Sequence, residues 1–86
     1  MNLAEKIKTL PAKEAIEYLS GIIDTDPLNE EAFTLRGKAH WSLNHRKEAI
    51  NDYLTAIKIN PQSKASILLE YANSILDYYN KDLLNP

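Results

Sequence analysis

The chain repeats itself with a period of 34 residues. The run Lys-Glu-Ala-Ile occurs at residues 13–16 and again at residues 47–50, and Pro27 is followed at the same interval by Pro61. A fixed period of this size is typical of solenoids in which helical hairpins stack on one another. The repeat therefore predicts an all-α fold built from antiparallel helical hairpins.

The rest of the sequence also favours helices. Only two Gly and four Pro interrupt the chain, and apolar residues recur at spacings of three and four. The breaks fall where Pro, Asn and Asp supply turn and capping chemistry. They predict about five helices and no strand, at roughly residues 2–9, 12–25, 29–43, 46–59 and 64–80, with residues 81–86 as a tail.

The stretch from Glu30 to Pro61 resembles the tetratricopeptide repeat, whose pattern is W-x2-L-G-x2-Y, then A-x3-F, then P. The matching positions are Phe33, Arg36, Gly37, His40, Ala49, Tyr53 and Pro61. Gly, Ala and Pro agree with the pattern, and Phe and Tyr are aromatic substitutes, whereas Arg36 and His40 depart from it. The resemblance implies one right-handed, tetratricopeptide-like α-solenoid over residues 1–86.

This single domain divides into a partial repeat at 1–27, a full repeat at 28–61 and a capping helix at 62–80. Counting 34 residues onward from Gly37 reaches Tyr71, which is too large for a helix crossing point. One extra residue in the turn after Pro61 places Ala72 there instead. We expect this second register, because it again puts a small residue at the crossing.

Two residue types carry the packing argument. A glycine inside a helix costs about 1 kcal/mol relative to alanine, so Gly37 predicts the close approach of a partner helix, with Ala49 on the other side of the contact. Pro27 and Pro61 lack an amide hydrogen and disfavour a helical residue before them. They are therefore expected to end the helices that precede them.

Composition excludes several function classes. The formal net charge is −2 and no stretch collects basic residues, so nucleic acid is not an expected partner. The absence of Cys excludes disulfides and thiol chemistry and fits the cytoplasm. The opening "MNLAEKIKTL" has charges throughout, so we expect neither a signal peptide nor a membrane segment there. A domain of 86 residues has modest stability, which keeps self-association open.

Catalytic and metal-binding chemistry are not expected. The sequence has no glycine-rich phosphate loop and no Ser-His-carboxylate spacing, so we predict a non-enzymatic protein without cofactors. His40 and His45 are about 140° apart at roughly 100° per helical residue, which argues against a ligand pair. His45, Glu48 and Asp52 have the spacing of one helix face, and such a set can hold a cation. Because charged triplets usually form a solvated face, we expect no metal.

The resemblance implies a protein-interaction module that binds a peptide or helix of a partner in a concave groove. Positions lining that groove in the family correspond here to Ile7, Lys8, Glu31, Thr34, Lys38, Trp41, Ser42, Leu69, Asn73, Leu76 and Asp77. Ile7, Trp41 and Leu76 would form an apolar row, as expected of an interface hot spot. In the alternative interpretation, Trp41 packs into the core with only its polar tip exposed.

The capping helix supplies a second candidate surface. Its apolar residues span roughly 200° around the axis, although a helix packed on one side needs a stripe of only about 100°. The surplus lies around Ile67, Tyr71, Tyr78 and Tyr79. This surplus predicts a homodimer or a partner helix, whereas the alternative is that the last hairpin covers most of the stripe.

Overall fold

The computed structural model describes the backbone of residues 2–84 and the side chains of residues 2–76. Residues 2–84 form no strand and five helices, which are α1 (Leu3–Lys8), α2 (Ala12–Thr25), α3 (Glu30–Ser42), α4 (Arg46–Ile59) and α5 (Ala65–Leu84). The predicted all-α fold is confirmed. None of these helices, within the described part of the chain, has the length and apolar character needed to cross a membrane.

The predicted end of the last helix at residue 80 is wrong, because α5 continues to Leu84. No Gly or Pro interrupts residues 65–84, so nothing in the sequence stops the helix at the expected place. Most of the segment assigned to a tail is therefore the last turn of α5.

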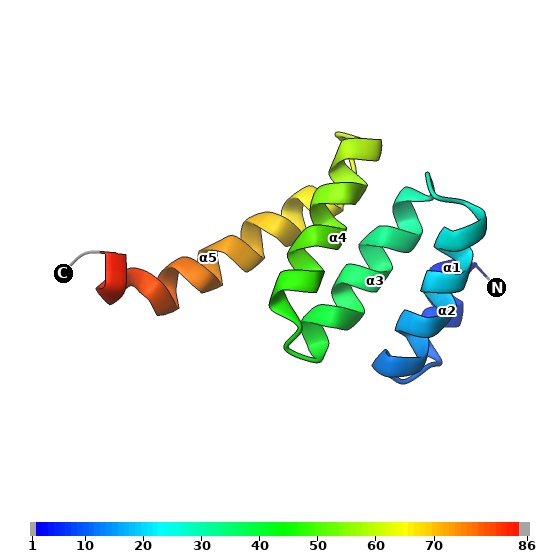
Figure 1. The fold of residues 1–86 in the computed structure, drawn as a ribbon, viewed down its shortest axis with the longest axis horizontal. Coiled ribbons are helices and arrows are strands. Elements are labelled where there is room, and N and C mark those ends of the chain that lie inside the picture. Colours follow the sequence, from blue (N-terminus) through cyan, green and yellow to red (C-terminus); the bar gives the residue numbers. More distant parts are fainter. Residues whose placement is uncertain (1, 85–86) are drawn as a thin grey trace.

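Helices α2, α3 and α4 lie side by side in chain order, and consecutive helices run in opposite directions (Figure 1). Helix α3 contacts α2 on one side and α4 on the other, and the short α1 also packs on α3. Helix α5 packs on α4, passes behind it in this view and continues to the end of the molecule opposite the N-terminus (Figure 1). The result is an elongated molecule of 48 × 27 × 20 Å.

The helix ends follow the capping residues. The side chain of Asn29 accepts a hydrogen bond from the amide of Ala32 at 3.0 Å, which fixes the start of α3. Asp26 and Asn60 are the C-caps of α2 and α4, and each directly precedes a proline. The prediction that Pro27 and Pro61 end the preceding helices is confirmed.

The α3–α4 hairpin closes over Gly37. A Cβ built on Gly37 would lie 2.6 Å from Cε1 of Tyr53 and 3.2 Å from the carbonyl oxygen of Ala49. Tyr53 is only 2% exposed and belongs to the core cluster with Ala49, Ala56 and Ala65. The predicted close approach at Gly37 is confirmed, because the glycine makes room for the ring of Tyr53.

The register of α5 is the one with the extra residue in the preceding turn. Ala72 is 1% exposed, whereas Tyr71 is 62% exposed. Ala65, near the start of the helix, is fully buried against α4. Small residues therefore lie where α5 meets the hairpin, and this contact orients the first half of the helix.

Arg36, which departs from the repeat pattern, joins three helices. Its guanidinium donates to both carboxylate oxygens of Asp52 on α4, at 2.9 and 2.8 Å, and to the hydroxyl of Ser20 on α2 at 3.1 Å. The side chains of Arg36 and Asp52 are 22% and 8% exposed. This bidentate ion pair fixes the position of α3 against α4. The ion pair with Asp52 raises the pKa of Arg36, so its charge is permanent.

Candidate functional site

One side of the molecule carries an open groove formed by α1, α3 and α5. It consists of two adjoining hollows of about 620 and 360 Å³, and both are lined by Ala4, Leu35 and Lys38. Lys38 lies near the middle of α3 and is exposed, so its ammonium group is available to a ligand in either hollow.

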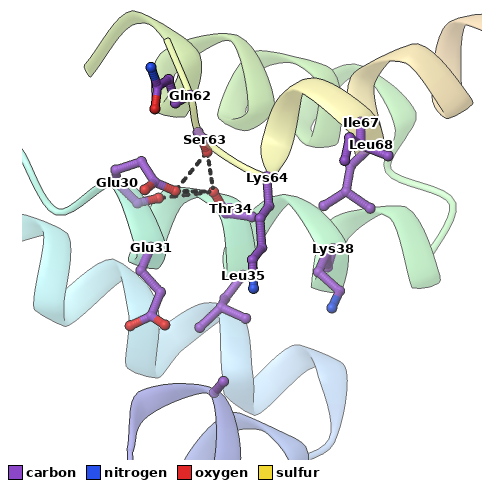
Figure 2. A pocket seen from close by; sticks show the side chains of 11 residues that line it. Glu30, Glu31, Thr34, Leu35, Lys38, Gln62, Ser63, Lys64, Ile67 and Leu68 are labelled. Atoms are coloured by element: carbon purple, nitrogen blue, oxygen red, sulfur yellow. Dashed lines mark hydrogen bonds between the residues drawn. The ribbon is translucent and has the colours of Figure 1, made fainter. Parts of the chain in front are cut away.

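The larger hollow lies between α3 and the start of α5 (Figure 2). Its apolar surface comes from Leu35 on α3 and from Ile67 and Leu68 on α5. Ile67 is 69% exposed, which leaves a large aliphatic side chain open to solvent at the mouth. Charged side chains surround this surface, and they are Glu30, Glu31, Lys38 and Lys64.

A buried hydrogen-bond network holds the wall of this hollow in place. The hydroxyls of Ser63 and Thr34 lie 2.7 and 2.8 Å from the same carboxylate oxygen of Glu30 (Figure 2). Ser63 also accepts from the amide of Ala65 at 3.1 Å and thereby caps the start of α5. The bond from Ser63 is the largest cause of a lowered pKa at Glu30, with smaller contributions from Thr34 and Lys64. The carboxylate of Glu30 is thus charged, and its hydrogen bonds to Ser63 and Thr34 hold it in the wall of the hollow.

The smaller hollow lies between α1, α2 and α3. Ile7, Leu10 and Ala12 give it an apolar surface, and Lys8 lies on α1 beside them. Ser42, at the end of α3, also lines it. The groove thus continues along the whole length of α3, from the wall at Ser63 to the last turn of that helix.

The predicted groove residues divide into two groups. The members on α1 and most of those on α3 line one of the two hollows, and they are Ile7, Lys8, Glu31, Thr34, Lys38 and Ser42. Trp41, Leu69, Asn73 and Leu76 line neither hollow. The side chain of Asp77 lies outside the described residues.

Trp41 is half-buried and lines neither hollow. The structure packs it against the core cluster of Ala49, Tyr53, Ala56 and Ala65, and the guanidinium of Arg46 lies 4.8 Å from the centre of its ring. This packing favours the core interpretation of Trp41, and the predicted row with Ile7 and Leu76 stays a prediction.

Helix α5 presents a different face to the groove from the one expected. Leu68 and Leu69 are both packed against the core cluster, and Leu68 also lines the larger hollow, together with Lys64 and Ile67. Of the residues predicted to form a dimer surface, Ile67 and Tyr71 are exposed at 69% and 62%. The side chains of Tyr78 and Tyr79 lie outside the described residues.

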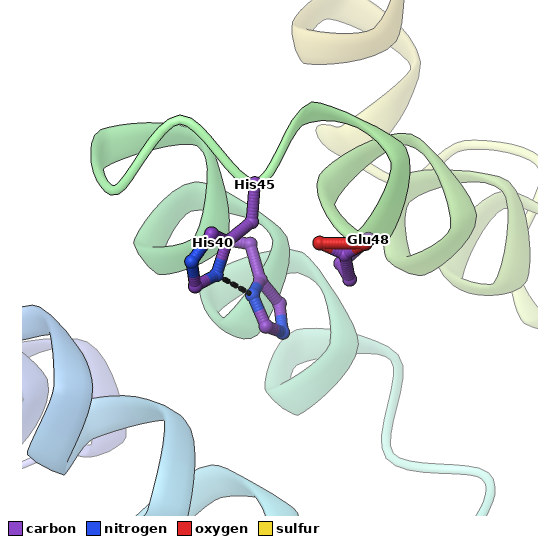
Figure 3. Close-up of side chains that lie close together, drawn as sticks. All are labelled: His40, His45 and Glu48. Carbon is purple, nitrogen blue, oxygen red and sulfur yellow. Dashed lines mark hydrogen bonds between the residues drawn. The ribbon is translucent and has the colours of Figure 1, made fainter.

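The prediction that His40 and His45 lie apart is also wrong, because their Nδ1 atoms are 3.1 Å apart (Figure 3). Helix α3 ends at Ser42, and Asn44 has a left-handed φ of 63°. The amide of His45 then donates to the carbonyl of His40 at 2.9 Å, and that of Asn44 to the carbonyl of Trp41 at 3.0 Å. These bonds form a Schellman motif that turns the chain back on itself.

Charged side chains from α3 and α4 surround the histidine pair. Partial burial lowers the pKa of His40, with Asp52 opposing the shift and His45 and Arg36 adding to it. Glu48 follows in the first turn of α4, and its carboxylate faces the two rings (Figure 3). Asp52, which the sequence grouped with His45 and Glu48, is bound to Arg36 instead.

Sequence reasoning missed several residues of the groove, notably Leu35, Gln62, Ser63, Lys64 and Leu68. Leu35 carried a usable signal, since it lies one turn before Lys38 on the predicted groove side of its helix. Lys64 and Leu68 carried none, because their orientation depends on how α5 crosses α4.

Comparison with family models matches residues 30–63 to the tetratricopeptide repeat. The matched segment covers α3, α4 and the turn up to Ser63. Searches of curated proteins and of solved structures found no match.

Proposed function

The chain contains a small tetratricopeptide-repeat-like helical domain, a type of module that generally mediates protein–protein interaction, and we propose that its groove binds a peptide or helix of a partner protein. The observation that carries this proposal is the continuous groove along α3, with α1 on one side and α5 on the other. Its apolar surface is open to solvent and would be covered by a ligand. The proposed role is non-enzymatic, and the expected compartment is the cytoplasm, which fits a chain without cysteine.

The charges of the groove favour a particular kind of ligand. Lys8, Lys38 and Lys64 are exposed along it, whereas Glu30 is already engaged by Ser63 and Thr34. Glu31 is the exposed carboxylate among its lining residues. We therefore propose a ligand with aliphatic or aromatic side chains for the apolar surface and acidic side chains beside the lysines. Such pairing at an interface governs association rate and specificity more than raw affinity.

The groove offers little support for a clamp on a C-terminal carboxylate. In the family such a clamp uses Lys, Arg and Asn from consecutive first helices, and here Lys38 and Asn73 hold two of those positions. Asn73 does not line either hollow, and the corresponding position on α1 is Ala4. An internal segment of a partner, rather than its C-terminus, is the better match to this groove.

Affinity capture with matched variants tests the proposal. Lys38→Glu reverses a charge at the centre of the groove, and Lys47→Glu reverses an exposed charge on α4, away from it. Proteins that the wild type captures from the native source should also be captured by Lys47→Glu. Lys38→Glu should capture at least about tenfold less of them, which corresponds to a loss of about 1.4 kcal/mol in binding free energy. Equal depletion by both variants, or by neither, would contradict a ligand site in this groove.

Self-association through α5 is a second candidate function, favoured by the exposure of Ile67 and Tyr71 one turn apart on the same helix. Ile67 also lines the groove, so a dimer formed there would compete with a ligand. Light scattering over a range of concentrations tests this candidate. A mass that rises with concentration in the wild type and stays monomeric in Tyr71→Glu would support it, and a monomer throughout would exclude it.

A further inference from the structure

We propose that His40, His45 and Glu48 bind one divalent transition-metal ion, with Zn²⁺ as the best match. Each of these residues offers one ligand atom, and the ligand atoms all lie within 4.8 Å of one another. Neither the repeat pattern nor the groove accounts for this cluster, which lies where α3 turns into α4 (Figure 3). The proposal differs from the expectations drawn from helical spacing, which were that His40 and His45 lie apart and that no metal binds.

The backbone that carries the ligands is well defined. The Schellman motif after α3 sets the position of His45 through its amide bond to the carbonyl of His40. Glu48 lies three residues later in the first turn of α4, one turn from His45 along the helix axis. The ligands thus come from one tight turn and the helix ends on either side of it, so little conformational entropy is lost when an ion binds.

The distances suit a small ion. In a tetrahedral zinc site with Zn–N bonds of roughly 2.0–2.1 Å, two nitrogen ligands lie about 3.3 Å apart. The two Nδ1 atoms are 3.1 Å apart, so an ion placed between them requires only a small movement of the rings. The ion would replace the single hydrogen bond that the nitrogens now share.

The ligand types narrow the choice of metal. Two imidazoles and one carboxylate suit Zn²⁺, Ni²⁺ or Cu²⁺, whereas Mg²⁺ and Ca²⁺ prefer sites made of oxygen ligands. Three protein ligands leave a tetrahedral position for water. An open hollow of about 520 Å³, which both histidines line together with Leu43, Ile16 and Glu17, gives solvent access to the rings.

A bound ion would cross-link the end of α3 to the start of α4. It would therefore stabilise the hairpin that also forms one wall of the groove, because any ligand bound only by the folded state raises stability. The cluster shares no residue with the lining of the groove. The metal proposal and the groove proposal are thus tested independently.

Calorimetric titration of untagged protein with zinc sulfate provides the test. His45 and Glu48 are exposed, so His45→Ala and Glu48→Gln can be made without disturbing the core, and Glu14→Gln on the exposed side of α2 is the matched control. We expect one ion per chain for the wild type and for Glu14→Gln, with affinity at least tenfold lower for His45→Ala and several-fold lower for Glu48→Gln. Zinc should also raise the melting temperature of the wild type, an effect that EDTA reverses and that magnesium does not reproduce.

Three results would overturn the proposal. They are the absence of saturable binding by the wild type, equal zinc affinity in the wild type and His45→Ala, and one ion shared by two chains with a matching increase of mass in light scattering. Circular dichroism of each variant checks that its helical content equals that of the wild type, so that lost binding reports the ligand and not the fold.

Discussion

The ring of Tyr53 occupies the space beside Gly37 that any larger residue would need. Its Cε1 and Cδ1 atoms would lie 2.6 and 2.7 Å from an added Cβ, well inside van der Waals contact. This contact explains why the central helix of the stack tolerates a glycine in its middle. The same two residues are positions of the repeat pattern, so one close approach sets the geometry of the α3–α4 hairpin in this chain.

Gly37→Ala should therefore destabilise the protein although alanine is the better helix former. The propensity gain of about 1 kcal/mol is outweighed by overpacking, which costs roughly 1–3 kcal/mol and more when the neighbour cannot move. We expect a net loss of about 1–2 kcal/mol in the free energy of unfolding, measured by urea denaturation. Gly21→Ala is the matched control, since nothing lies within 4 Å of its added Cβ, and it should gain about 0.5–1 kcal/mol. Equal effects at both glycines would contradict the account.

Trp41→Ala should reduce stability and not merely binding. Trp41 is half-buried against the core cluster and under the guanidinium of Arg46. Fully buried aromatic residues cost roughly 3–5 kcal/mol when truncated to alanine, so we expect about 2–3 kcal/mol here. Tyr71→Ala, which removes an exposed aromatic side chain, should change the unfolding free energy by at most about 0.5 kcal/mol. An unchanged urea midpoint for Trp41→Ala would contradict a role of Trp41 in core packing.

Asp52→Ala should lower the free energy of unfolding more than the removal of both Arg36 and Asp52 together. The single substitution leaves the guanidinium of Arg36 between α2 and α4 without its carboxylate. Removing one partner of a buried pair costs roughly 3–5 kcal/mol, and the partial exposure of Arg36 reduces our expectation to about 2–3 kcal/mol. The double variant Arg36→Leu/Asp52→Ala should recover part of this loss. Additive losses in the double-mutant cycle would show that the two side chains do not interact.

Stability should fall as the solution is acidified past the pKa of histidine. Burial places the pKa of His40 in the folded state below its ordinary value of 6.5, so the unfolded chain binds the proton more readily. The contribution is present above about pH 6.5 and is lost as the pH falls through the lower, folded pKa. Melting temperatures measured in EDTA from about pH 8 to about pH 5 should decrease less for His40→Asn than for the wild type. Parallel curves would contradict the lowered pKa.

The fold could be predicted from the sequence because its signals are local and repeated. The recurrence of Lys-Glu-Ala-Ile, the glycine at position 37 and the prolines at 27 and 61 each fix a helix, a crossing or a turn. The groove positions on α1 and α3 were implied by the resemblance to the tetratricopeptide repeat. The extra residue after Pro61 was also recoverable, since it alone places Ala72, which is buried, at the crossing.

The remaining features depend on contacts between helices, which the sequence repeat does not reveal. Arg36 meets Asp52 across two helices, and no pattern of either helix alone announces the pair. The part of α5 that faces the groove depends on the angle at which the helix crosses α4. The histidine pair had one local signal, the Asn44 that takes a left-handed conformation after α3, but helical spacing was extended through a helix end where it no longer applies.

The groove itself is tested most directly by mapping a bound peptide onto the amide resonances of the isotopically labelled wild-type protein. Peptides selected from a random display library should carry acidic and apolar side chains and should shift amides that line the groove, among them Ala4, Thr34, Lys38 and Ile67. Amides on the outer faces of α2 and α4, such as those of Tyr18 and Leu54, should not move. Shifts concentrated on those outer faces, with the groove unchanged, would contradict the proposed function.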